Sequence, residues 1–421
     1  MVNSRNMKMT PIGLIPEDWD VIQLADHVVD INDGPFGSNL KSEHYTLDRE
    51  VRIIQLGNVG DNGWNDENVK YTTFEHASTL KRCIVPYGTI IIAKMMPAGR
   101  AIVCPSSEPA YIQGSDVIKV VFSDSIDKDF FIYLTKSKAY LEQIESGVQG
   151  STRARTNIGK IKSLKLPLPS IEEQKRIAGA LLSVDKMIGA LDEAITKKSQ
   201  IKEGLMQQLL TGEAVIPEYS GEWQKKRVGD IGFTYSGLTG KTKNDFGHGE
   251  AQYITFLNVL NNPVLNTDAF EKVDVRSDER QNAAKKGDLF FNTSSETPEE
   301  VGICALLSAD INNLYLNSFC FGFRLTDPDV DGLYLSYFWR SKQGREIMSA
   351  LAQGATRYNL SKEYFNKAII TLPPIELQRY IANTITVAHK EIAELEQKRD
   401  KYLLIKQGMM QELLTGKTRL V

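Results

Sequence analysis

One segment of this 421-residue chain occurs twice, and this repeat constrains the fold more than any other feature. The copies, 168–212 and 372–416, align without a gap at a constant shift of 204 positions. Both begin with Leu-Pro, continue with Ile-Glu, Gln and Ile-Ala at matching positions, and end in Leu-Leu-Thr-Gly. Such a match indicates a duplicated structural element.

Each copy has the apolar spacing of a coiled-coil helix, with alternating steps of four and three residues. Pro169 and Pro373 precede the pattern and Gly212 and Gly416 follow it, as expected at the start and end of a helix. At 1.5 Å per residue each helix would extend on the order of 60 Å. The residues predicted to form the helix seam and to support partner docking are Ile177, Leu181, Val184, Ile188, Leu191, Ile381, Ile385, Ile392 and Leu395.

The repeat also extends in front of the helices, because Ile15-Pro16-Glu17 returns as Ile216-Pro217-Glu218. Short β-prone runs and one helical stretch fill each half. We therefore predict an α+β protein with two mixed α/β globular domains, related by pseudo-two-fold symmetry and joined by two long antiparallel coiled-coil helices. The predicted segments are 1–165 (domain 1), 166–212 (first helix), 213–369 (domain 2) and 370–421 (second helix). The last residues should return to the first.

Composition restricts the class of protein. No apolar run has the length of a membrane span, and the polar start of the chain lacks a signal-peptide core, so a cytoplasmic location is expected. The four cysteines (Cys83, Cys104, Cys304, Cys320) have no zinc-ligand or disulfide spacing, and the histidines are isolated. We expect no metal site.

Catalytic motifs fail when tested residue by residue. Gly237 to Thr242 resembles a phosphate-binding loop, but Tyr235 stands where the first glycine is required. Leu372-Pro373-Pro374-Ile375 lacks both ends of the adenine-methyltransferase tetrapeptide, and no nuclease, metalloprotease or serine-hydrolase signature is present. We expect no catalytic residue and no cofactor bound by this chain.

Two related globules on a rigid spacer suit a partner with two separated, related sites, such as duplex DNA. Segments common to both halves would do common work. Gln149 to Arg153 reads Gln-Gly-Ser-Thr-Arg, and Gln353 to Arg357 reads Gln-Gly-Ala-Thr-Arg. The two arginines either contact phosphate or pair with local acids and helix ends, and the sequence favours neither alternative.

Loops that differ between the halves would read different base sequences. Loops also contain ordinary solvated side chains, so no single loop residue indicates DNA binding, and only the loop residues taken together do. The candidate DNA-binding residues, including the common arginines, are Ser38, Asn39, Lys41, Lys94, Arg100, Arg153, Arg155, Lys241, Lys243, Asn292 and Arg357.

With these motifs the chain resembles the specificity subunits of type I restriction-modification systems. The resemblance rests on the twice-written Leu-Pro to Leu-Leu-Thr-Gly segment, on the Asp33-Gly34-Pro35-Phe36-Gly37-Ser38 loop and on the Gln-Gly-x-Thr-Arg segments. It implies two target recognition domains, each reading half of a split, asymmetric site on double-stranded DNA. It also implies helices that fix the spacer and dock two adenine-N6 methyltransferase subunits, with two endonuclease subunits joining for cleavage. S-adenosylmethionine, ATP and magnesium would belong to those partners.

A competing hypothesis is a two-lobed protein scaffold that touches no DNA. A stand-alone modification enzyme is disfavoured by the missing motifs. The two half-sites and the spacer length lie beyond what the sequence specifies.

Overall fold

The computed structural model describes residues 7–146, 155–214, 216–219 and 221–420. It contains two compact units: unit 1 comprises Met1–Asp192 with Lys398–Val421, and unit 2 comprises Glu193–Gln397. Unit 1 therefore combines both end regions of the chain, and each long helix contributes to both units. The four segments predicted from the sequence, with the helices as segments of their own, remain a prediction.

An antiparallel four-stranded sheet forms the centre of each unit, and its strand order is the same in both units. In unit 1 the order is β4 (Val28–Asp33), β14 (Val117–Phe122), β11 (Ile90–Ala93), β12 (Ala101–Val103). In unit 2 it is β17 (Gly232–Ser236), β24 (Cys320–Leu325), β20 (Leu289–Asn292), β22 (Cys304–Leu306). Every residue of β11 and β20 is buried, as expected for strands covered on both faces.

A second, mixed sheet lies against the first in each unit. Unit 1 has β10 (Ile84–Val85), β13 (Tyr111–Gln113), β6 (Val51–Ile54), β9 (Tyr71–Thr72) and β5 (Tyr45–Thr46). Unit 2 has β19 (Glu271–Val273), β18 (Phe246–Ile254) and β23 (Leu314–Leu316). β13 runs parallel to β6 and β23 parallel to β18. Apolar clusters around Ile54 and Ile91, and around Ile254 and Phe290, join the two sheets.

Short elements complete the units. Unit 1 contains the strand pairs β1 (Met7–Thr10) with β2 (Gly13–Pro16), β3 (Asp20–Gln23) with β15 (Lys165–Leu168) and β7 (Val59–Gly60) with β8 (Gly63–Trp64), and the helices α1 (Phe74–Thr79), α2 (Lys128–Leu134), α3 (Lys138–Glu145) and α4 (Ile158–Lys162). Unit 2 contains β16 (Gln224–Arg227) with β27 (Ile369–Leu372), the sheet β21 (Ser294–Ser295), β26 (Tyr358–Leu360), β25 (Ala352–Gln353), and the helices α6 (Val228–Ile231), α7 (Phe256–Asn261), α8 (Gly332–Arg340), α9 (Lys342–Leu351) and α10 (Lys362–Lys367).

The helical stretch expected in each half is two helices instead of one. Ser137 and Ser341, which match at the 204 shift, cap the second helix of each pair by accepting from the amides of Tyr140 and Gly344. An N-cap residue has extended backbone angles, so the chain turns there and a new helix begins.

The two long helices are continuous and antiparallel, as predicted: α5 (Ile171–Thr211) has 41 residues and α11 (Ile375–Leu413) has 39. In unit 1 Asp185 lies 2.5 Å from Lys406, and Asp192 lies 3.8 Å from Arg399. In unit 2 the ion pair Lys198–Glu391 spans 2.5 Å. Among described residues, no helix is long and apolar enough to cross a membrane.

The residues predicted to form the seam lie inward on these helices. Ile177, Leu181, Ile381 and Ile385 are at most 1 % exposed, and Leu191 and Ile392 are 8 % exposed. The other three, Val184, Ile188 and Leu395, are half-buried. In unit 2 Ile381 and Ile385 share a core cluster with Leu209 and Leu210, and in unit 1 Ile177 and Leu181 share one with Leu413 and Leu414.

A buried glutamine attaches the start of each long helix to its globule. The amide of Gln174 donates to the carbonyls of Ser125 (2.9 Å) and Pro169 (3.0 Å), and its oxygen accepts from the backbone of Asp127 (2.8 Å). Gln378, its repeat partner, makes the same three contacts to Asp329, Pro373 and Asp331. The repeated Ile-Glu-x-Gln motif therefore fixes where the globule meets the helix.

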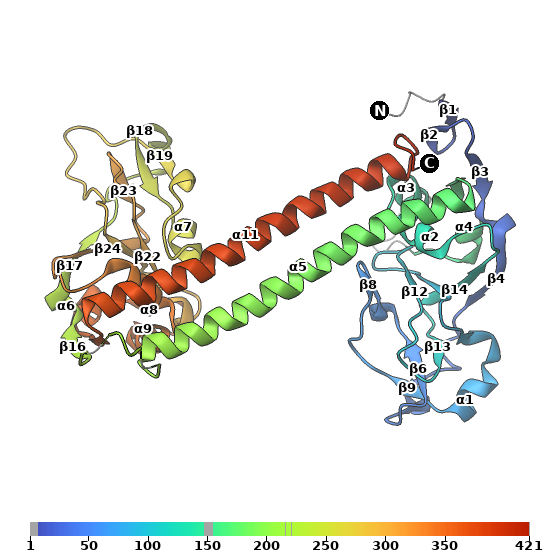
Figure 1. Cartoon of the computed structure of the whole chain (residues 1–421), viewed down its shortest axis with the longest axis horizontal. Coiled ribbons are helices and arrows are strands. Elements are labelled where there is room, and N and C mark those ends of the chain that lie inside the picture. Colours follow the sequence, from blue (N-terminus) through green and yellow to red (C-terminus); the bar gives the residue numbers. More distant parts are fainter. Residues whose placement is uncertain (1–6, 147–154, 215, 220, 421) are drawn as a thin grey trace. The chain divides into compact units, whose positions relative to one another are not determined.

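The end regions meet in unit 1, as the repeat predicted (Figure 1). The guanidinium of Arg419 donates to both carboxylate oxygens of Glu173 and, at 2.8 and 2.9 Å, to those of Asp18. It also lies over the ring of Trp19, 5.5 Å from the centroid, while the indole nitrogen donates to Glu173 (3.1 Å). Arg419 and Glu173 are almost fully buried, and their hydrogen bonds raise the pKa of Arg419.

Candidate nucleic-acid interface

A basic groove opens on unit 1 between the end of strand β4 and helix α1. It has a volume of about 910 Å³ and is lined by the loop after β4, by residues 78–83 and by positions on neighbouring segments. Its cations are Lys81, Arg82, Lys94 and Arg155, whereas Asp33 is the single carboxylate among the described lining residues. A concave surface in which positive side chains outnumber negative ones attracts a polyanion such as a nucleic-acid backbone.

The groove cations are held to different degrees. Lys94 is 11 % exposed and fixed by Asp33, 2.6 Å from its Nζ, and by the carbonyl of Ser115 at 2.9 Å. Arg155 is 57 % exposed and donates one hydrogen bond to Asp116 at 2.8 Å. An arginine carries five N–H donors, so the exposed guanidinium of Arg155 has donors left for a phosphate.

The loop that enters the groove requires a glycine at its first turn. A Cβ on Gly34 would lie 1.7 Å from the carbonyl oxygen of Gly114, so no side chain fits. Gly237 occupies the same place in unit 2, where a Cβ would lie 2.0 Å from the carbonyl oxygen of Asn317. Close backbone contact thus fixes both loops at the end of the first strand of the central sheet.

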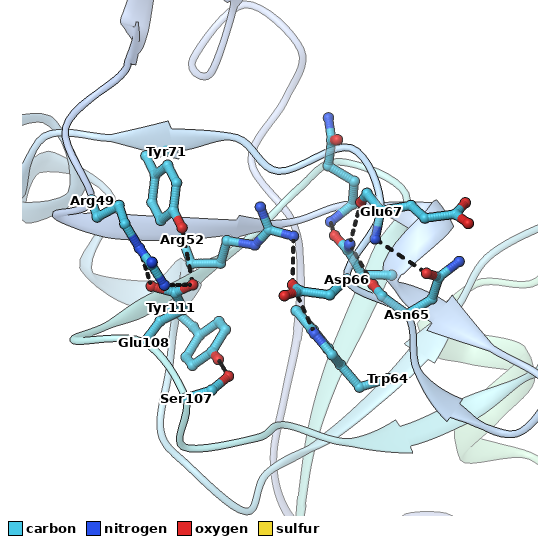
Figure 2. Close-up of polar contacts among 12 residues, drawn as sticks. Arg49, Arg52, Trp64, Asn65, Asp66, Glu67, Tyr71, Ser107, Glu108 and Tyr111 are labelled. Atoms are coloured by element: carbon cyan, nitrogen blue, oxygen red, sulfur yellow. Dashed lines mark hydrogen bonds and ion pairs between the residues drawn. The ribbon is translucent and has the colours of Figure 1, made fainter. Parts of the chain in front are cut away.

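A fully buried arginine organises the segment between β6 and β9 (Figure 2). Arg52 is 0 % exposed, donates to Asp66 at 3.2 Å, and lies over the rings of Trp64 (5.8 Å) and Tyr71 (5.6 Å). The indole of Trp64 donates to the same Asp66 oxygen at 3.1 Å. The Nε and Nη1 atoms of Arg52 have no hydrogen-bond partner among the described residues.

A buried asparagine supports the same segment. The amide of Asn58 donates to the carbonyls of Asn65 (2.8 Å) and Glu67 (3.1 Å), and its oxygen accepts from the amide of Gln55 (2.8 Å). Asn258 in unit 2 does equivalent work, since it exchanges hydrogen bonds with the backbone of Asn266. The sequence patterns did not identify Asn58 and Asn258 as supporting residues, although an Asn-Val pair follows a β-prone segment in both halves.

One of the predicted residues, Arg100, lies in the loop after β11 and contacts the turn of the hairpin β7–β8. Arg100 is 21 % exposed, lies 3.3 Å from Asp61 in the hairpin turn, and donates to the carbonyl of Met96 at 2.6 Å. The hairpin and the 94–100 loop are therefore one connected surface of unit 1.

Of the two Gln-Gly-x-Thr-Arg segments, the one in unit 2 lies within the described residues and the one in unit 1 does not. In unit 2 the segment forms the turn between β25 and β26, where Arg357 is exposed and β26 pairs with β21. In unit 1 Arg153 lies outside the described residues, but Thr156 just beyond it donates to the carbonyl of Lys94 at 2.8 Å and Arg155 bridges to Met95. Strand β26, which follows the unit 2 turn, and Arg155 and Thr156, which follow the unit 1 segment, thus each lie beside the loop that leaves the central strand of their sheet.

The remaining predicted residues divide into surface and interior positions. Lys243, Ser38, Asn39 and Lys41 are exposed. Lys241 is 5 % exposed and paired with Glu279 at 2.6 Å. Asn292 is fully buried and bonded to the backbone of Ser294, Glu300 and Ile303. Because their polar atoms serve internal contacts, we leave Lys241 and Asn292 out of the proposed DNA surface.

The thiols and histidines of the described chain form no reactive centre. Burial raises the pKa of the Cys104 and Cys320 thiols to about 12, which keeps them protonated. No group of three or more histidine, cysteine or acidic side chains suited to a metal occurs among the described residues. Desolvation, with the nearby cations Lys202 and Arg340, lowers the pKa of His389 to about 4.

Comparison with known proteins gives one consistent family. The family model described as "Type I restriction modification DNA specificity domain" matches residues 16–203 and again 220–403. The MjaVIII specificity subunit of a type I restriction enzyme from Methanocaldococcus jannaschii is 28% identical over 50% of this chain, and the alignment spans about half (49%) of that protein. A putative MjaX specificity subunit from the same organism is 23% identical over 98% of this chain and 97% of its own length.

A solved structure has the same fold. The S subunit of a type I restriction-modification system from M. genitalium superposes with a TM-score of 0.59 over 96% of this chain and 99% of that one, at 14% identity.

Proposed function

Because the chain belongs to the type I restriction-modification DNA specificity family, with both halves matched, we propose that each unit reads one half of a bipartite, asymmetric DNA site. The two half-sites would be separated by an unspecific spacer. The single observation that carries this proposal is the repetition of one sheet order in two units that share the same two antiparallel helices. A duplicated reader with a fixed spacer matches a split site on duplex DNA.

The proposed DNA surface of unit 1 is the basic groove with the loop after β4. In unit 2 the corresponding surface contains Lys243 and the Arg357 turn. The common glycines Gly34 and Gly237 would hold the loops in place, whereas the side chains that differ between the loops would select bases.

The helices α5 and α11 would set the spacer and dock two adenine-N6 methyltransferase subunits, to which endonuclease subunits add. The chain would itself be non-catalytic and bind no cofactor, while S-adenosylmethionine, ATP and magnesium act on the partners. Exposed apolar side chains on the helices, such as Leu404 (70% exposed) and Val387 (57% exposed), support a protein-binding role.

The test is to express this chain with the adenine methyltransferase encoded beside it, in a host without other adenine methylation, and to map N6-methyladenine by single-molecule sequencing. We expect two short half-sites around a fixed gap. A stable complex without methylation would favour the scaffold alternative, and a continuous motif would mean that only one unit reads DNA.

The phosphate contacts are tested separately by salt dependence. Arg155→Ala and Arg357→Ala should weaken binding about equally for all sequences and reduce the salt slope by about one each. Lys138→Ala is the matched control, because that side chain is 88% exposed and paired with Glu142 in unit 1, away from the groove. Unchanged slopes in both arginine variants would remove the phosphate role.

The spacer is tested by inserting four residues, about one helical turn, into both long helices. The unspecific gap should lengthen while both half-sites stay the same. A changed half-site would contradict the division of labour between globules and helices.

A further inference from the structure

Unit 1 holds one large aromatic side chain almost entirely in solvent at the mouth of the basic groove. Phe36 is 83% exposed and lines the groove together with the cations. Phenylalanine is among the residues most often buried, although a single exposed ring does not by itself indicate a binding site. The backbone and the charges around Phe36 do indicate one.

The backbone on both sides of Phe36 is fixed. Pro35 before it is buried, and Gly34 donates to the carbonyl of Val117 at 3.3 Å. The carbonyl of Phe36 itself accepts from the amide of Asn39 at 2.7 Å, and the ring nitrogen Nε2 of His76 lies 2.9 Å from the Asn39 carbonyl oxygen. A ring on such a loop is presented to a ligand with little loss of conformational entropy on binding.

The groove supplies charge around the ring. Lys81, Arg82, Lys94 and Arg155 line the same concavity, with Asp33 as the one described carboxylate there. An aromatic face beside clustered cations is the combination by which proteins bind nucleic-acid bases and backbone together. Apolar side chains also enter a duplex as wedges that separate neighbouring bases.

We propose that Phe36 is a wedge that stacks on a base in the half-site read by unit 1 while the surrounding cations hold the flanking phosphates. This proposal rests on the DNA-reading function proposed above. Phe36 would then be a specificity-determining residue, because the cost of unstacking depends on the base step that is opened.

Unit 2 lacks this device. Two positions after Gly237, the residue that corresponds to Gly34, stands Thr239, whose amide donates to the side chain of Gln281 at 3.1 Å. The next residue after Gly237, Leu238, is buried like Pro35. Distortion by an aromatic wedge should therefore occur in the unit 1 half-site only.

The experiment uses the complex of the full chain with its methyltransferase and duplexes that carry 2-aminopurine at successive positions of both half-sites. Adenine methyltransferases extrude their target base from the stack, so brightening at the target adenines is expected with every variant. With the wild-type chain we expect brightening at one further step, in the unit 1 half-site, because the wedge separates the probe from its neighbour. Phe36→Ala should abolish this further brightening and weaken binding by roughly 5- to 150-fold. The salt slope should not change, since no phosphate contact is lost.

Phe36→Leu keeps bulk without an aromatic face and should restore binding only in part. Phe36→Trp should bind like the wild type and show indole quenching on DNA. The matched control is Phe74→Ala, because Phe74 is another exposed ring of unit 1 (54% exposed) that does not line the groove. It should leave binding and brightening unchanged.

The proposal is overturned if Phe36→Ala binds DNA within twofold of the wild type, or if brightening at the step outside the target adenines persists without the ring. It is also overturned if the variant loses the methyltransferase instead of DNA, which would make Phe36 a protein contact. Failure of the proposed function is a different result, because the wild-type complex would then show no split methylation motif at all.

Discussion

Arg419 should be one of the residues on which unit 1 depends most. Its side chain and that of Glu173 are 5% and 3% exposed, and Arg419→Met would leave the Glu173 carboxylate buried without its cation. Breaking a buried ion pair by removing one partner costs about 3–5 kcal/mol. Asp18 is 61% exposed and can return to water, so we assign most of this cost to Glu173.

The double variant Glu173→Leu with Arg419→Met tests this assignment. The second copy of the repeat has Leu377 at the position of Glu173, and Leu377 is well buried there. Removing both charges should recover stability to within about 1–3 kcal/mol of the wild type, because the indole of Trp19 still loses its acceptor. Lys138→Met, which breaks an exposed pair, should change stability by less than about 1 kcal/mol.

The assay is amide hydrogen exchange followed by mass spectrometry, since it reports the opening free energy of each unit separately. Peptides from β3, β15 and the start of α5 should exchange roughly 150- to 5000-fold faster in Arg419→Met, as 3–5 kcal/mol implies. Peptides of unit 2 should not change. A loss below about 1 kcal/mol, or a double variant as unstable as the single one, would refute the reasoning.

Three further variants test the site and its support. His389→Phe should reduce the pH dependence of the stability of unit 2. The pKa of His389 in the folded state, about 4, lies below the ordinary 6.5, so its contribution to stability is complete above pH 6.5 and is lost as the pH falls toward 4. Urea midpoints that shift equally between pH 7 and pH 4.5 in the variant and the wild type would contradict this. Gly34→Ala should destabilise unit 1 by at least about 2 kcal/mol in thermal unfolding, whereas Gly57→Ala, with nothing within 4 Å of the new Cβ, should change it by less than about 1 kcal/mol. Asn58→Ala should cost about 2 kcal/mol or more, because three buried backbone groups lose their partner, and equal exchange rates for residues 55–67 in variant and wild type would refute that role.

The sequence predicted the long helices well because their information is local and periodic. A regular apolar seam with proline before it and glycine after it specifies a helix without reference to the rest of the chain. The break between α2 and α3 was missed, although Ser137 is a favoured N-cap residue. Apolar residues continue on both sides of that break, so the pattern alone reads as one helix.

Site residues were harder to predict because a polar side chain in a loop can serve either the solvent or the interior. Lys241 and Asn292 have the chemistry of base readers, but Lys241 pairs with Glu279, 38 positions further on, and Asn292 is buried against the backbone of the turn that follows its own strand. Arg52 shows the reverse: a cation in the run Val51–Ile54 is buried because Trp64 and Tyr71 close over it. Local sequence contains neither fact.

The contact between Arg419 and Glu173 also sets an order of folding during synthesis. Unit 2 is a continuous stretch, Glu193–Gln397, and its last residues leave the ribosome before Lys398–Val421. Synthesis begins with unit 1, but folding of unit 1 is completed last. Its core around Trp19 and the start of α5 needs contacts from the end of α11 and from Arg419. Until then Glu173 has no cation and Leu181 lacks its cover from Leu413 and Leu414. Nascent unit 1 should therefore expose an apolar surface for most of translation, and a premature stop in α11 should leave it without the contacts of Leu413, Leu414 and Arg419.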